Sequence, residues 1–367
     1  MNKPKYAYET PIQPEIWTEP DFHTDHAFSI AFVGDPQYIS TGDYFLGTKK
    51  MKQLFASIAN TAKERKLEHV FILGDLTDMG YRNDGNLAWM HYDPPITAEW
   101  ENAKEAVFQL NEAKIPFSLC RGNHDDYMID DFFNVPEYTN QFKGCGGFFS
   151  DCDAKHPECR EKNNPDRYIY WSAISGHYKE SIVNSYKTVE ICGIKYLFVT
   201  VDFNPTAKVF EWLDQILGKY PDHLAIVATH SFINKKGAIR TSEKADTMFP
   251  LGYTADKLWE NVLKKHKNLL MVVCGHVDSL APVCTTKIGD HENTVHFFLI
   301  NPQGYDTKEA EDGSILKGIQ DTGMVLYMNF SADGSKITFD NYATLLNKEL
   351  AANTDTEFTL FETNPLA

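Results

Sequence analysis

Five clusters of acidic, amide and imidazole side chains follow short apolar runs along this chain. Carboxylate and amide oxygens are the donors that hard divalent cations prefer, and imidazole nitrogens suit transition metals. Glycine precedes most of these groups, so that the backbone and a cation can approach each other closely. A metal centre is therefore the first hypothesis for the chemistry. The clusters are Gly34-Asp35-Pro36-Gln37, Gly74-Asp75, Gly122-Asn123-His124-Asp125, Thr229-His230 and Gly275-His276-Val277-Asp278.

The apolar runs before these clusters have the length and composition of buried strands. Segments with apolar residues at helical spacing separate most of them. This alternation predicts an α/β fold with parallel strands and crossover helices, in which ligands gather at the carboxyl ends of the strands. The predicted strands are 28–35, 69–75, 116–120, 223–229 and 268–274, and the predicted helices are 49–66, 97–114, 207–220 and 254–266.

Other segments depart from this alternation. Two runs, 188–192 and 195–202, flank Gly193 and predict a hairpin. The last ninety residues predict antiparallel strands at 295–300, 323–329 and 336–339. Residues 134–186 show little periodicity and predict a long insertion. We therefore predict an N-terminal extension (1–25), a single domain (26–345) with that insertion, and a C-terminal tail (346–367).

The order of the clusters resembles the calcineurin-like metallophosphoesterase superfamily. The series D-x-[HQ], G-D, G-N-H-[DE], H and G-H-x-[HD] is matched from Asp35 to Asp278, and the specific tetrapeptide Gly122-Asn123-His124-Asp125 is intact. Residues 74–80 also resemble the G-D-x-x-D-x-G pattern of the protein-phosphatase branch. The resemblance implies a four-layer α/β/β/α sandwich of two mixed sheets with flanking helices.

The resemblance also implies two divalent metal ions about 3.5–4 Å apart, with a hydroxide shared between them as the nucleophile. The first ion would be surrounded by the oxygen donors Asp35, Gln37, Asp75 and Asp278. Asp75 would bridge to the second ion, which Asn123, His230 and His276 would complete.

Two positions depart from the family pattern, and both belong to the first ion. Gln37 and Asp278 stand where most members have histidine. An oxygen-only set favours Mg²⁺, Mn²⁺ or Ca²⁺ over Zn²⁺, whereas a site with two imidazoles can take Mn²⁺, Fe²⁺ or Zn²⁺. We therefore expect one tightly bound ion and one labile ion.

Three further residues are catalytic candidates by the same resemblance. His124 would contact the phosphate or protonate the leaving group, and Asp125 would orient the His124 imidazole. Arg121 would hold two phosphate oxygens with its guanidinium fork. The alternative for Arg121 is a salt bridge at the end of a strand.

Composition narrows the partners and the location. The 367 residues include 35 basic and 51 acidic ones, for a net charge of −16, and no basic run of five or more occurs. Such a chain should repel nucleic acids, so we expect a small phosphorylated substrate or a phosphoprotein.

The apolar runs are far shorter than the roughly 18 residues of a membrane span. With no apolar leader in the first twenty residues, we expect a cytoplasmic location, and the alternative is an exported protein from which a signal has been removed. Cys145, Cys152 and Cys159 could form a loop disulfide or a metal site.

Three functions remain open at this point. The favoured one is a phosphomonoesterase, supported by Arg121 and the two Gly-Asp motifs. The second is a phosphodiesterase or nucleotide pyrophosphohydrolase, because some members with Gln in the first motif cleave pyrophosphate linkages. The third is a non-catalytic binding protein in which the first metal site has degenerated.

Overall fold

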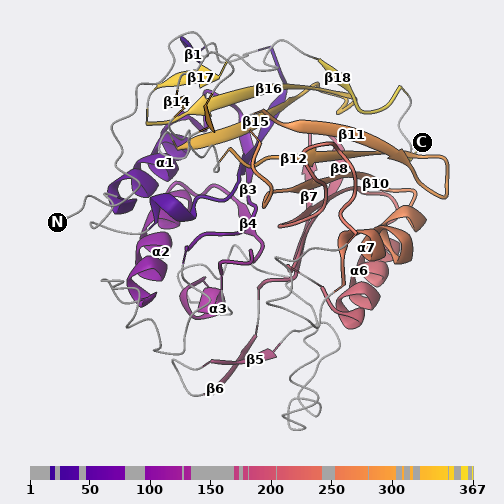
Figure 1. The fold of residues 1–367 in the computed structure, drawn as a ribbon. Helices are drawn as coiled ribbons and strands as arrows, with labels where there is room; N and C mark the ends of the chain where they lie inside the picture. The colour runs from indigo at the N-terminus through magenta and orange to yellow at the C-terminus, as the bar shows by residue number, and fades with distance from the viewer. Residues whose placement is uncertain are drawn as a thin grey trace.

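The structure is a computed structural model of the chain, and it places two sheets face to face between helices (Figure 1). It describes residues 17–20, 25–40, 47–78, 96–125, 128–133, 169–172, 177–180, 182–203, 205–241, 253–279, 281–302, 308–309, 315–316, 323–345, 347–350, 357–362 and 366.

The first sheet is mixed and contains eight strands. Its parallel part is β2 (Phe28–Val33), β3 (Leu67–Ile72) and β4 (Phe117–Leu119). On the other side of β2, β15 (Met324–Phe330) and β16 (Lys336–Ala343) follow in antiparallel order. The edge is completed by the short strands β17 (Lys348–Leu350), β1 (Trp17–Thr18) and β18 (Phe358–Thr359).

The second sheet has six strands in the order β11-β12-β10-β9-β8-β7. Its four central strands run parallel to one another, and each edge strand is antiparallel to the central strand beside it. The strands are β7 (Ser185–Ile191), β8 (Ile194–Val201), β9 (Leu224–Thr229), β10 (Leu269–Cys274), β11 (Val283–Ile288) and β12 (Thr294–Leu299).

Helices cover the outer face of each sheet. On the first sheet lie α1 (Gly47–Thr61), α2 (Ile96–Glu112) and α3 (Met128–Phe133), and on the second lie α6 (Ala207–Lys219) and α7 (Ala255–Asn261), as Figure 1 shows. The short 3-10 helices η2 (Gln37–Ile39) and η7 (Leu263–Lys265) and the small hairpins β5 (Ile169–Ser172)–β6 (His177–Glu180) and β13 (Lys308–Glu309)–β14 (Ile315–Leu316) complete the described elements.

Three apolar clusters hold the layers together. One fills the seam between the sheets, where Phe32 and Phe71 of the first sheet lie in the same buried cluster as Phe198 of the second. The other two lie under the helices of each outer face. Strands buried on both faces read as continuous apolar runs, which is why the sequence shows runs such as LLMVVC in β10. The expected four-layer α/β/β/α architecture is confirmed.

The predicted hairpin around Gly193 is confirmed. β7 and β8 pair with Ile191 opposite Ile194, and the two turn residues, Cys192 and Gly193, have φ values of 52° and 78°. Positive φ at both central positions is the requirement of a two-residue type I′ turn.

The expectation that the last ninety residues are antiparallel is wrong for one strand. β12 pairs parallel with β10 and antiparallel with β11, a strand that the sequence analysis did not find. β11 is an edge strand, and its residues 283–288 (VCTTKI) are partly exposed and largely polar. They therefore do not form the continuous apolar run from which a buried strand is predicted. β12 instead lies inside the sheet and is buried along nearly its whole length.

The domain limits stay a prediction. Most of the insertion at 134–186, including Cys145, Cys152 and Cys159, lies outside the described residues. Within 346–367, β17 and β18 pair with β16, and β17 also pairs with β1 near the N-terminus. The predicted helix at 254–266 ends at Asn261 and continues as the 3-10 helix η7.

Candidate metal centre and active site

The backbone turns sharply where the strands end. Asp35, Asp75 and His276 follow β2, β3 and β10, and their φ values are 46°, 50° and 69°. Residues other than glycine rarely adopt this left-handed conformation, and such strain is typical of functional sites. The bend at each strand end directs the three side chains to one place between the two sheets.

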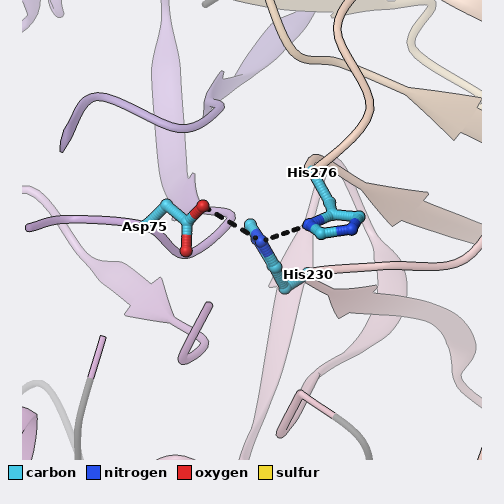
Figure 2. Close-up of side chains that lie close together, drawn as sticks. All are labelled: Asp75, His230 and His276. Atoms are coloured by element: carbon cyan, nitrogen blue, oxygen red, sulfur yellow. Dashed lines mark hydrogen bonds and ion pairs between the residues drawn. The ribbon is translucent and has the colours of Figure 1, made fainter. Parts of the chain in front are cut away.

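Four side chains converge on a single point. One ligand atom each from Asp75, His230 and His276 lies within 4.8 Å of the others. His230 Nε2 lies 3.3 Å from Asp75 Oδ2 and 3.2 Å from His276 Nδ1, as Figure 2 shows. Asn123 Oδ1 lies 2.9 Å from His230 Nε2 and 2.7 Å from His276 Nδ1. This is the donor set of two imidazoles, a carboxylate and an amide expected for the second ion.

The backbone sets the orientation of His230. Its Nδ1 lies 2.8 Å from the carbonyl oxygen of Leu73, which can only accept, so Nδ1 carries a hydrogen and Nε2 faces the cluster. Burial lowers the pKa of His230, but Asp75 and Asp35 outweigh burial and raise it to about 9. The site thus holds negative charge that attracts a proton or a cation to this imidazole.

Asp35 belongs to the group of residues predicted to hold the first ion. Its carboxylate accepts from the backbone N of His276 at 2.9 Å and from Asn301 Nδ2 at 2.5 Å. Burial raises the pKa of Asp35 well above its usual value, and the neighbouring carboxylates of Asp75 and Asp278 raise it further. Carboxylates crowded in this way favour a proton or a cation among them.

Gln37 links the two groups of ligands. Its Nε2 donates to Asp75 Oδ2 at 3.1 Å. Its Oε1 is buried, and among the residues that the structure describes it has no hydrogen-bond partner. A buried acceptor without a donor is costly, and this oxygen belongs to the residue predicted to ligate the first ion.

The family assignment follows from a match over most of this region. A model of the family described as calcineurin-like phosphoesterase matches residues 28–279, more than half of the chain. The chain belongs to the calcineurin-like phosphoesterase family. The matched residues run from β2 to just past Asp278, so that they include every predicted metal ligand.

Other comparisons give distant relatives of this phosphoesterase. It is 23% identical over 298 residues to the uncharacterized protein YvnB of Bacillus subtilis strain 168, and the match covers 80% of this chain but 18% of that longer protein. Among solved structures it is similar to GAP50, the anchor in the inner membrane complex of Plasmodium (TM-score 0.42, 12% identity, 90% of this chain and 88% of that one). It is also similar to TT1561 of Thermus thermophilus (TM-score 0.37, 10% identity, 91% of this chain and all of that one).

The residues of this phosphoesterase fit divalent metal ions. The unpartnered Gln37 Oε1, the crowded carboxylates around Asp35 and the imidazole nitrogens of His230 and His276 that face each other are all arrangements that a cation would satisfy. All seven predicted ligand residues lie one to four residues beyond the carboxyl end of a strand.

The structure corrects the predicted role of Asp125. Its buried carboxylate accepts from the backbone N and Oγ1 of Thr77 at 3.0 and 3.1 Å and from the backbone N of Gly122 at 3.0 Å. Asp125 therefore joins the loops after β3 and β4, and it is Asp78 that lies at His124 Nδ1. The reason is that closely spaced backbone and hydroxyl donors surround its carboxylate, and the imidazole of the preceding residue has its own partner elsewhere.

Asp78 contacts the imidazole of His124. The Nδ1 atom of His124 lies 2.7 Å from the carbonyl oxygen of Asp78 and 3.2 Å from its Oδ1. Burial lowers the pKa of His124, but the hydrogen bonds that His124 donates to Asp78 and the charge of Asp75 raise it to about 10. The backbone N of His124 also donates to Asp75 Oδ1 at 2.9 Å, which places this imidazole beside the metal ligands.

Arg121 matches the alternative interpretation, a salt bridge at the end of a strand. Its Nε donates to Asp202 Oδ1 at 2.8 Å and its Nη2 to Asp202 Oδ2 at 3.2 Å, and both side chains are more than nine-tenths buried. The fork that was predicted to hold two phosphate oxygens thus holds two carboxylate oxygens of the protein.

Two glycines are required by close approach to carboxylates. A Cβ atom on Gly122 would lie 2.0 Å from Asp75 Oδ1, and one on Gly275 would lie 2.2 Å from Asp35 Oδ1. Real Cβ atoms do not approach other atoms so closely. Glycine at these positions therefore leaves room for the ligands themselves.

The sequence analysis missed Asp78, Asn301 and Asp202 as residues of the site. The sequence holds a signal for each of them, because Asp202 directly follows an apolar strand, Asn301 comes two residues after one, and Asp78 belongs to the motif at 74–80. Within the part of the chain that the structure describes, no helix combines the length and apolar character needed to cross a membrane.

Proposed function

We propose that this phosphoesterase hydrolyses phosphomonoesters at a centre of two divalent metal ions. The observation that carries the proposal is the contact between His124 and Asp78 beside Asp75. Asp78 is the second aspartate of the motif that resembles the protein-phosphatase branch. Its contact with His124 supplies a protonated donor next to the metal ligands.

The ions would occupy two adjacent positions. The first would be held by Asp35, Gln37, Asp75 and Asp278, and the second by Asp75, Asn123, His230 and His276. When bound, divalent ions neutralise the charge of a phosphate and lower the pKa of a water molecule. We propose Mn²⁺, Mg²⁺ or Fe²⁺ as the ions, with Zn²⁺ an option at the second position, because the first position offers only oxygen donors.

The chain's own groups then have distinct tasks. His124 donates its Nε2 proton, the one not held by Asp78, to the oxygen of the leaving group as the P–O bond breaks, so that the group departs as an alcohol and not as an alkoxide. Asp78 holds the ring in place and keeps it protonated. Because about a third of the His124 side chain is exposed (31%), a bound substrate can reach it from solvent.

A phosphodiesterase is the second candidate, and the Arg121–Asp202 pair favours it. A phosphomonoester carries up to two negative charges, whereas a diester carries one. Because Asp202 neutralises Arg121, this arginine adds little net positive charge toward the second charge of a monoester.

Two aryl substrates separate the candidates. The purified protein is assayed with p-nitrophenyl phosphate and bis-p-nitrophenyl phosphate after addition of Mn²⁺. The proposal expects a higher kcat/KM for the monoester, and loss of activity in the Asp75→Asn variant. A preference for the diester would select the second candidate, and no hydrolysis of either would support a non-catalytic member.

For the partners we propose small phosphorylated molecules or phosphoproteins and no nucleic acid. The net charge of −16 supports this, because a polyanion gains its affinity from many basic contacts. A phosphoserine peptide and a short oligonucleotide, offered at equal concentration and low salt, test the choice: the proposal expects turnover of the peptide alone.

A further inference from the structure

One buried ion pair connects the two sheets beside the metal centre. Arg121 follows β4 of the first sheet, and Asp202 follows β8 of the second. Two hydrogen bonds join the guanidinium to the carboxylate, and a third runs from Arg121 Nη2 to the carbonyl oxygen of Phe203 at 3.3 Å. The backbone N of Asp202 donates in turn to Asn184 Oδ1 at 2.9 Å, which anchors this strand end.

The residue after Asp202 contacts both metal-binding imidazoles. The ring of Phe203 lies 5.6 Å from that of His230, in an edge-to-face arrangement at 72°, and 5.8 Å from that of His276. The two imidazoles are themselves 4.9 Å apart. Phe203 is buried (1% exposed), so it closes this side of the imidazole pair to water.

Arg121, at the other end of the ion pair, lies close in the chain to Asn123. Asn123 is predicted to hold the same ion as His230 and His276. Arg121 is separated from Asn123 by Gly122 alone, and Gly122 lies against the Asp75 carboxylate. The ion pair therefore joins the loop that carries Asn123 to the residue that packs on His230 and His276. A displacement of either loop would change the distance between the amide oxygen and the imidazole nitrogens.

We infer that Arg121, Asp202 and Phe203 form a brace that sets the geometry of the second metal position. Arg121 is then a positioning residue that acts through Asp202 and Phe203, and it is not a ligand of the substrate phosphate. The inference rests on the proposed two-metal centre, which supplies the ion whose binding the brace controls. Residues that hold metal ligands in place typically contribute about 10- to 100-fold to metal affinity.

Calorimetric titration of the metal-free protein with Mn²⁺ measures the brace directly and needs no substrate. The variant Phe203→Leu removes the ring and leaves the ion pair intact. We expect it to bind one of two Mn²⁺ ions about 10- to 100-fold more weakly, with the other ion unchanged. The matched control is Asp222→Asn, which breaks the exposed pair with Lys195 and should bind both ions like the wild type. Equal affinities in Phe203→Leu and the wild type would overturn the inference.

A second variant tests whether Arg121 acts by position or by contact with phosphate. Arg121→Lys keeps the positive charge but not the two-pronged contact. The brace predicts a lower kcat at limiting Mn²⁺ that excess Mn²⁺ restores, with KM for p-nitrophenyl phosphate unchanged. A raised KM that excess Mn²⁺ does not correct would overturn it and make Arg121 a substrate ligand.

The brace and the proposed function can fail independently, and the measurements distinguish the two failures. If the wild type hydrolyses no phosphoester but Phe203→Leu still weakens one Mn²⁺ ion, the proposed function fails and the brace stands. If hydrolysis is normal and Phe203→Leu binds Mn²⁺ normally, the brace fails and the proposed function stands. Circular dichroism of each variant confirms folding, and Phe203→Leu serves where Arg121→Lys does not fold, because it leaves no buried charge unpaired.

Discussion

Replacing Asp78 with asparagine should shift the pH dependence of hydrolysis to lower pH. The carboxylate of Asp78 lies 3.2 Å from His124 Nδ1, and it is a main reason that the pKa of His124 is raised to about 10. Asp78→Asn keeps the backbone carbonyl that also accepts from His124 but removes the charge. A general acid acts only when protonated, so activity falls as the pH rises through its pKa, and this fall should begin earlier in the variant.

The size of the shift follows from the geometry. Two unit charges 3.2 Å apart attract by about 5 kcal/mol at an effective dielectric constant of 20. Both side chains are partly exposed, at 31% and 23%, so that water screens much of this attraction. A charged neighbour at this distance typically shifts a pKa by about 1–3 units, and we expect the alkaline limb of the profile to move by that amount.

The assay is kcat/KM against pH for a series of aryl and alkyl phosphates at saturating Mn²⁺. His124→Ala should lose about 10²- to 10⁴-fold with alkyl phosphates and less with p-nitrophenyl phosphate, because a good leaving group needs little protonation. Asp125→Asn is the control, since Asp125 contacts Thr77 and Gly122 and should lower stability without moving the alkaline limb. An unshifted limb in Asp78→Asn, or a shifted one in Asp125→Asn, would refute the assignment of Asp78.

Three further predictions concern the ligands, a glycine and a buried histidine. Asp75→Asn removes the carboxylate expected to bridge both ions, so bound metal, measured by mass spectrometry, and turnover should be lost together. Gly122→Ala places a Cβ 2.0 Å from Asp75 Oδ1, and we expect both weaker Mn²⁺ binding and a loss of about 1–3 kcal/mol in urea unfolding. Burial lowers the pKa of His69 well below its usual value, so the unfolded chain binds a proton that the folded chain does not. Stability should therefore fall below about pH 6.5 by up to about 1.4 kcal/mol per pH unit, and His69→Gln, unlike the exposed His291→Gln, should flatten that slope.

The strand ends that carry the candidate metal ligands could be predicted because a local rule places them. A buried parallel strand is a continuous apolar run, and the residue after it lies at the edge of the sheet where neighbouring strand ends meet. Asp35, Asp75 and His230 each obey this rule, and the structure brings Asp75 and His230 within 3.3 Å of each other. The same rule predicted the limits of β3, β9 and β10 to within a few residues.

Partners across the site could not be predicted in this way. Asp125 and Asp78 are both carboxylates close to His124 in the fold, but one is a chain neighbour and the other arrives from the loop after β3. Adjacency in sequence favoured Asp125, although adjacent side chains in an irregular loop often point in different directions. The partner of Arg121 lies 81 residues away on the other sheet, and nothing in the local pattern of either residue indicates it.

β12 shows the same limit at the level of the fold. Its apolar run predicts a strand, but the choice between parallel and antiparallel neighbours depends on which edge of β10 is open when the chain returns. β11 and β12 form a hairpin, so this local connection is antiparallel. The prediction of antiparallel strands holds for that pair but not for the pairing of β12 with β10.

The candidate site is divided between the two sheets. The sequence therefore predicts which residues stand at the strand ends but not how those residues are arranged relative to one another. Asp35, Asp75 and Asn123 follow strands of the first sheet, whereas His230 and His276 follow strands of the second. The predicted ligand set of each ion draws on both sheets, so the geometry of the centre depends on how the apolar seam between the sheets packs. Local sequence determines which residues stand at the strand ends, and the packing of Phe32, Phe71 and their neighbours determines how far apart those ends lie. A metal bound between the two halves would in turn favour the packed arrangement of the sheets, because ligands held by both are brought together only in the folded chain.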